Sequence, residues 1–186
     1  MAPSVKKKFI LVHIMLLLIV VSSYARFSTM VTRDEINSIC KASEDFSSSL
    51  CFEVLKPTPG IAALDFSGLI KFLINYESQN MSDTLKHIKL FVDNTTDFRS
   101  HNIYLACVEE YENALYFNQI SFKDLASKDY DSLNVRVTAT MTSVSECSDD
   151  VLTIKPIPQF FIMRNEIIGN LSTIVLVILE GFIRKN

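Results

Sequence analysis

The stretch YLACVEEYENALYFNQISFKDL, Tyr104–Leu125, decides the fold. Its apolar and weakly polar residues recur every three or four positions: Tyr104, Cys107, Tyr111, Ala114, Asn118, Phe122 and Leu125. This period places them on one face of an α-helix, with acidic and amide side chains on the other face. The stretch therefore predicts a long amphipathic helix that carries one cysteine on its apolar face.

Three other stretches have helical spacing, namely residues 61–92, 133–151 and 160–182. The first has a break in phase between Tyr76 and Met81. The second contains LNVRVTAT, which also fits a strand, but its stripe continues to Val151 and favours a helix. Short links between long helices force antiparallel neighbours. We therefore predict an all-α fold, an up-and-down four-helix bundle over residues 61–186.

Residues 26–60 precede the bundle and end in two prolines and a glycine. Ile36–Cys40 and Leu50–Leu55 read as two short helices, joined by a polar connection inside CKASEDFSSSLC, residues 40–51. We expect a helical hairpin here, and together with the bundle it makes one domain, residues 26–186.

The first 25 residues have the pattern of a secretory signal peptide. Three lysines precede thirteen apolar residues, and small residues follow at Ser23 and Ala25. Thirteen helical residues span about 20 Å, less than the ~30 Å of a bilayer core, which disfavours a membrane anchor. We expect cleavage after Ala25 and export, with no membrane attachment afterwards. Three sequons fit export, at Asn80, Asn94 and Asn170.

All four cysteines lie in the exported part: Cys40, Cys51, Cys107 and Cys147. An even count in an oxidising compartment predicts two disulfides, and three connectivities are possible. Cys107 and Cys147 lie on the apolar stripes of consecutive helices, which an antiparallel arrangement brings together. The sequential pairing is preferred, and the crossed pairings would instead join the first segment to the bundle.

Charge and motifs exclude several functions. Cleavage of the signal peptide removes three lysines and leaves 15 basic against 21 acidic residues. The exported chain therefore lacks the excess of basic residues that nucleic-acid binding requires. Its two histidines, His87 and His101, adjoin no nucleophile, and no spacing suggests a metal site or a cofactor. Glu109, Glu110 and Glu112 fit a solvated helix face better than an active site. The apolar last stretch suits a buried bundle helix better than a membrane span.

Four motifs in order resemble those of the plant invertase and pectin methylesterase inhibitors: INSICKASEDFSSSLC (36–51), RSHNIYLACVEEYENAL (99–115), LASKDYDSLNVRVTATMTSVSEC (125–147) and NLSTIVLVIL (170–179). The resemblance is closer to the pectin methylesterase inhibitor branch. It implies bonds Cys40–Cys51 and Cys107–Cys147. It also implies a secreted, non-catalytic protein that binds one cell-wall pectin methylesterase in the apoplast and covers its pectin-binding cleft.

The second and third long helices are the contact surface that the resemblance implies. On their outer faces we expect binding by Asn113, Tyr116, Gln119, Asn134, Thr138, Thr142 and Glu146. Acid invertase is the alternative target. The family's invertase inhibitors use a Pro-Lys-Phe loop, whereas this chain has Ser127-Lys128-Asp129-Tyr130. Two departures from the pectin branch are Glu146, where threonine is common, and Ser172, where several members have cysteine. A carrier of apolar ligands and an enzyme are weaker alternatives.

Overall fold

The computed structural model describes residue 15 and residues 30–42, 48–56 and 60–184. The predicted signal peptide therefore lies, but for Met15, outside the described residues. Val31–Asn186 form one compact unit. Its elements are α2 (Arg33–Ala42), α3 (Ser48–Val54), η1 (Ile61–Ala63), α4 (Phe66–Asn94), α5 (Phe98–Ser127), α6 (Tyr130–Val151), α7 (Gln159–Ile178) and the π-helical turn η2 (Leu179–Ile183).

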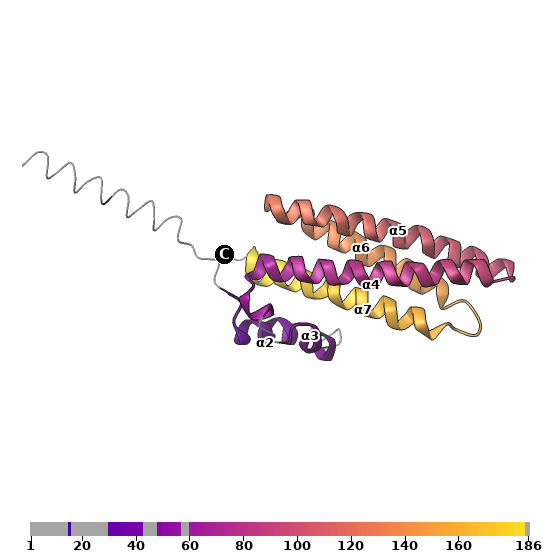
Figure 1. Ribbon diagram of the computed structural model, residues 1–186, viewed down its shortest axis with the longest axis horizontal. Coiled ribbons are helices and arrows are strands. Elements are labelled where there is room, and N and C mark those ends of the chain that lie inside the picture. The colour runs from indigo at the N-terminus through magenta and orange to yellow at the C-terminus, as the bar shows by residue number, and fades with distance from the viewer. Residues whose placement is uncertain (1–14, 16–29, 43–47, 57–59, 185–186) are drawn as a thin grey trace, which may run out of the picture. The chain divides into compact units, whose positions relative to one another are not determined.

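Helices α4 to α7 run alongside one another as an antiparallel bundle (Figure 1). Every described element is helical, so the predicted all-α fold is confirmed. The stretch that also fitted a strand lies within α6, because its buried residues follow the helical period.

Aspartates begin three of the four long helices. The side chains of Asp65, Asp97 and Asp129 accept hydrogen bonds from the backbone N–H groups three residues on, at 2.7, 2.8 and 3.1 Å. Each bond satisfies a donor that the first helical turn leaves unpaired. Lys128 ends α5 with φ 59° and donates its N–H to carbonyls of that helix. Lys128 and Asp129 alone join α5 to α6, which forces the two helices to run antiparallel.

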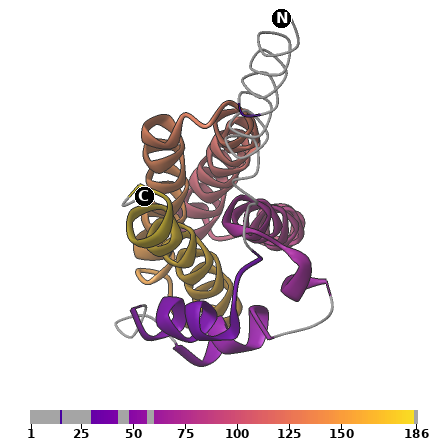
Figure 2. The same ribbon diagram turned by 90° about the vertical axis from the view of Figure 1, so that its left-hand side faces the viewer.

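Both disulfides are present, with the sequential pairing. Cys107–Cys147 joins α5 to α6 with a Cα–Cα distance of 4.8 Å, and Cys40–Cys51 joins α2 to α3 with 5.4 Å. The hairpin of α2 and α3 packs against α7. Figure 2, which views the bundle end-on, shows the hairpin beside that helix. Its fully buried Ile39 and Leu55 belong to the same apolar cluster as residues of α7. The hairpin therefore adds to the core of the bundle.

A polar layer divides the bundle core into two apolar clusters. Buried polar residues from all four long helices contribute to it, including Glu77 of α4, Asn118 of α5, Thr140 of α6 and Ser172 of α7. One cluster lies on the hairpin side of this layer, and the other lies on the side of the Cys107–Cys147 disulfide. The layer explains the break in phase in α4: the buried stripe passes through Glu77, whereas Tyr76 is 37% exposed.

The apolar stretch from Gln159 to Ile183 is the one described helix long and apolar enough to cross a membrane by length and composition. In this structure it lies in the bundle, and nine residues of α7 are buried. Burial against α4, α6 and the hairpin accounts for its composition.

Candidate partner-binding surface

Two contacts fix the register of α5 against α6. One is the Cys107–Cys147 disulfide, and the other is the bond from Thr140 Oγ1 to the Ala114 carbonyl at 3.4 Å. Counting along both helices from these contacts places Tyr116 level with Thr138, and Asn113 level with Met141, the residue before Thr142. These four predicted contact residues therefore lie at neighbouring heights on the two helices.

Six of the seven predicted contact residues are exposed: Asn113, Tyr116, Gln119, Thr138, Thr142 and Glu146. Tyr116 is the largest of them and is 59% exposed, although aromatic rings are favoured in interface cores. An exposed tyrosine among small polar residues is a typical anchor for a protein partner.

Gln119 and Asn134 lie apart from the others. Gln119 shares a helix face with Glu112, seven residues before it, and Glu112 pairs with Lys89 of α4 at 2.9 Å. Gln119 is therefore turned toward the α4 side. Asn134 is half-buried and donates to Glu180 Oε1 at 2.9 Å. Its amide ties α6 to η2.

Val135 belongs to the exposed face of α6 and was not among the residues expected from sequence. It is 61% exposed. Polar side chains mark an outer face in sequence, whereas an apolar residue off the buried stripe gives no such signal. Val135 and Tyr116 together give this surface two exposed apolar side chains.

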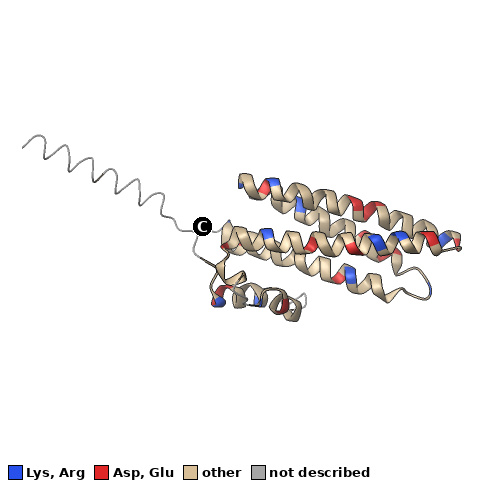
Figure 3. Ribbon diagram, in the orientation of Figure 1, with Lys and Arg blue, Asp and Glu red and all other residues tan. Residues whose placement is uncertain are grey.

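Acidic residues gather on α5 at Glu109, Glu110 and Glu112, and Figure 3 shows red along this helix. Glu109 and Glu112 are exposed, as a solvated face requires. Among the described residues no group of three or more His, Cys, Asp or Glu side chains is arranged to hold a metal ion. The cluster therefore gives the enzyme hypothesis no geometric support.

Among the described carboxyl groups, Glu77 has the pKa that lies furthest from its ordinary value. Burial raises its pKa to about 8, and hydrogen bonds from Ser172 and Asn118 offset part of that rise. Asn118 Nδ2 donates to Glu77 Oε2 at 2.5 Å, and the Ser172 hydroxyl donates to Oε1. Because Glu77 is 1% exposed, it is enclosed in the core and cannot reach a partner.

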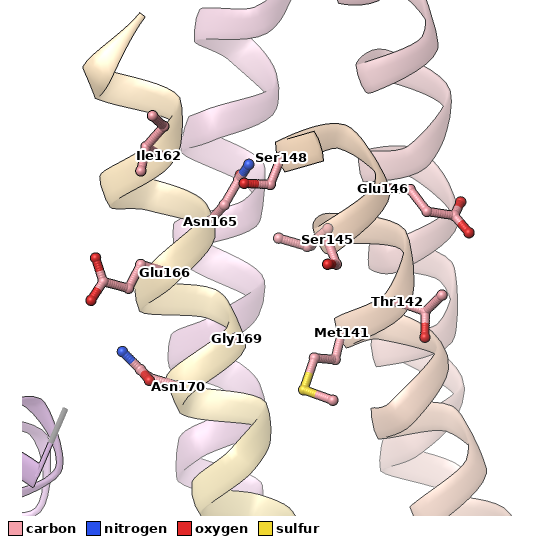
Figure 4. Close-up of a pocket in the computed structure, with 11 residues that line it drawn as sticks. Met141, Thr142, Ser145, Glu146, Ser148, Ile162, Asn165, Glu166, Gly169 and Asn170 are labelled. Atoms are coloured by element: carbon pink, nitrogen blue, oxygen red, sulfur yellow. The ribbon is translucent and has the colours of Figure 1, made fainter. Parts of the chain in front are cut away.

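A groove of about 640 Å³ lies between α6 and α7 (Figure 4). Thr142 and Glu146, two of the predicted contact residues, are on its α6 side. The groove opens to solvent, while the core between the helices is filled by apolar and polar side chains. This arrangement gives the carrier hypothesis no support, because a carrier encloses its ligand.

The three sequons differ in exposure. Asn94 is exposed at the end of α4. Asn80 is half-buried, and its Oδ1 accepts from Arg164 at 3.2 Å. Asn170 is 5% exposed, and Ser172 of the same sequon is fully buried. The expected glycan at Asn170 does not fit the folded chain, because α7 would have to leave the core to carry it.

The fold and the surface define a class. The chain is a helical bundle tied by two disulfides, with an exposed polar face anchored by one tyrosine and with its most perturbed carboxyl buried out of reach. These features are those of a small helical-bundle domain held by disulfides.

A family model described as plant invertase/pectin methylesterase inhibitor matches residues 34–178, and the chain belongs to this family. Pectinesterase inhibitor 1 from Arabidopsis thaliana is 30% identical over 178 residues, which is 96% of each chain. The pectinesterase inhibitor of Actinidia deliciosa is 28% identical over 179 residues, again 96% of each chain. These relatives are inhibitors and not enzymes, and neither is this chain an enzyme.

A solved structure supports the same family. The crystal structure of mutant form A of a pectin methylesterase inhibitor from Arabidopsis superposes with a TM-score of 0.72 and 28% sequence identity. The match covers 79% of this chain and 96% of that one. The predicted family is therefore confirmed.

Proposed function

We propose that this chain is a secreted inhibitor that binds plant cell-wall pectin methylesterase, one inhibitor to one enzyme, and covers the cleft that takes up pectin. The observation that carries the proposal is the match to two named pectinesterase inhibitors over 96% of the chain. The signal-peptide pattern and the two disulfides support export to the apoplast.

The outer face of α5 and α6 is the contact surface in this proposal. Asn113, Tyr116, Thr138 and Thr142 supply an aromatic anchor surrounded by hydrogen-bonding groups. Glu146 lies beside them and is exposed. A carboxylate here favours a target that presents a lysine or arginine opposite it, because an unpaired charge at an interface weakens binding.

The test is a titration of purified mature protein into pectin methylesterase, with methanol release as the readout, and into acid invertase, with hexose release. We expect stoichiometric loss of methanol release. Loss of hexose release alone would assign the chain to invertase. Full activity of both enzymes at an inhibitor concentration about a hundredfold above a micromolar dissociation constant would refute inhibition.

Replacing Tyr116 with alanine should weaken inhibition about tenfold or more, because truncating an interface tyrosine removes a buried anchor. The measurement is the inhibition constant from methanol release. Tyr76→Ala is the matched control, since Tyr76 is an exposed tyrosine on α4, outside the proposed surface. Equal inhibition constants for the two variants would place the contact surface elsewhere.

Asn94 should carry a glycan when the chain passes through a plant secretory pathway. It is exposed at a helix end, where the sequon Asn94-Thr95-Thr96 is accessible. Intact-mass spectrometry should show the loss of one glycan in Asn94→Gln and no change in Asn170→Gln. A mass loss in Asn170→Gln would show that glycosylation precedes the burial of α7.

A further inference from the structure

The groove between α6 and α7 combines apolar walls with a hydrogen-bonding group that lacks a partner. Met141 and Val144 of α6 and Ile162 of α7 supply apolar lining. Ser148 and the amide of Asn165 point into the space between the two helices (Figure 4). Mostly apolar walls with a few polar groups are typical of binding sites.

The amide nitrogen of Asn165, Nδ2, is the polar atom that lacks a partner. Asn165 is 6% exposed, and its Oδ1 accepts from the Tyr111 hydroxyl of α5. That bond holds the amide in place, and its Nδ2 has no hydrogen-bond partner. A buried N–H group without an acceptor is costly, so an oxygen atom brought into the groove from outside would relieve it.

Gly169 leaves the α7 side of the groove without a side chain. A Cβ atom built at this position meets nothing within 4 Å, so no contact within the described chain requires glycine there. Glycine destabilises a helix interior relative to alanine. Its presence in the middle of α7 is explained if an outside group comes close to the helix backbone.

Charge limits the identity of that group. Glu146 and Glu166 flank the groove, one on each helix, and their side chains turn away from each other (Figure 4). Both are exposed, and neither takes part in an ion pair among the described residues. No lysine or arginine lines the groove. Two unpaired carboxylates disfavour an anionic ligand such as pectate and attract a basic one.

We propose that the groove receives a loop of the bound pectin methylesterase. The loop places an apolar side chain between α6 and α7, a carbonyl oxygen at Asn165 Nδ2, and a lysine or arginine beside Glu166. The proposal rests on the proposed function and adds α7 to the contact surface of α5 and α6. Thr142 and Glu146 belong to both surfaces, so one enzyme can cover them together.

The steric test fills the groove. Gly169→Leu should raise the dissociation constant for the esterase about tenfold or more, measured by isothermal titration calorimetry, because the added side chain occupies the space for the loop. Gly181→Leu is the matched control, since a Cβ there also meets nothing within 4 Å and Gly181 is not among the groove residues. Equal dissociation constants for the two leucine variants would overturn the proposal.

The charge test does not depend on how well the leucine variant folds. Glu166→Lys should weaken binding about tenfold, mainly through slower association, and the loss should shrink at high salt. Glu53→Lys, an exposed position on α3, is the control. If Glu166→Lys leaves the association rate with the esterase unchanged, the proposal of a basic loop is wrong. If the unaltered protein binds no esterase, the proposed function itself fails. Failure of the groove proposal is a different result, because it appears only in the comparison of the variants with their controls.

Discussion

Replacing Glu77 with glutamine should remove most of the loss of folding stability between about pH 4.5 and about pH 8. Glu77 lies in the polar layer of the core, 1% exposed. Burial raises its pKa from 4.5 to about 8, so the folded chain keeps the proton over this range. The carboxyl oxygens accept from Ser172 and Asn118, and keeping the proton avoids a buried charge.

The direction of the effect follows from the order of the two pKa values. The unfolded chain loses the Glu77 proton near pH 4.5, while the folded chain keeps it until about pH 8. Rising pH therefore favours the unfolded state over this interval. The contribution is fully present below pH 4.5 and is lost progressively up to pH 8, by an amount of about 5 kcal/mol. That is a large part of the 5–15 kcal/mol or so typical of a domain.

Urea unfolding at about pH 5 and about pH 8 measures this loss as a change in the free energy of unfolding. Glutamine keeps the shape of the side chain and cannot ionise, so the variant should lose far less stability on going to the higher pH. Glu109→Gln removes an exposed carboxyl of α5 and is the control. If Glu77→Gln keeps the pH dependence of the unaltered protein, other groups cause it.

The four long helices could be predicted from sequence because their signal is local. The stripe from Tyr104 to Leu125 repeats every three or four residues, and residues on that stripe are buried in α5. The stripe also contained Asn118, and this was a visible sign of the polar layer. Its partners Glu77 and Ser172 lie 41 and 54 residues away, and spacing alone cannot connect them. Only the packing of α4, α5 and α7 brings the three side chains together.

The candidate site was predictable in part for the same reason. Tyr116 and Thr138 were expected on outer faces because they lie off the buried stripes, and both are exposed. The groove could not be predicted, since it depends on the spacing between α6 and α7. The roles of Asn165 and Gly169 follow only when the neighbouring helix is in place.

Removing the Cys107–Cys147 disulfide should lower the free energy of unfolding by about 4 kcal/mol. The bond closes a sequence separation of 40 residues, against 11 for Cys40–Cys51. In the chain-entropy model the shorter loop is worth about 3 kcal/mol, so the bundle bond has the larger effect. Replacing both cysteines of a pair with alanine avoids free thiols, and urea unfolding under non-reducing conditions measures each loss.

The two variants should also differ in which part of the chain opens. Cys107 and Cys147 lie inside the apolar cluster far from the hairpin, so their loss should lower the protection of amide hydrogens throughout α5 and α6. Without Cys40–Cys51, the short α2 and α3 should exchange amide hydrogens faster while α4 to α7 keep their protection, because a helix of ten residues or fewer is marginal alone. Equal loss of protection across the whole chain in both variants would show that the hairpin and bundle unfold as one cooperative unit.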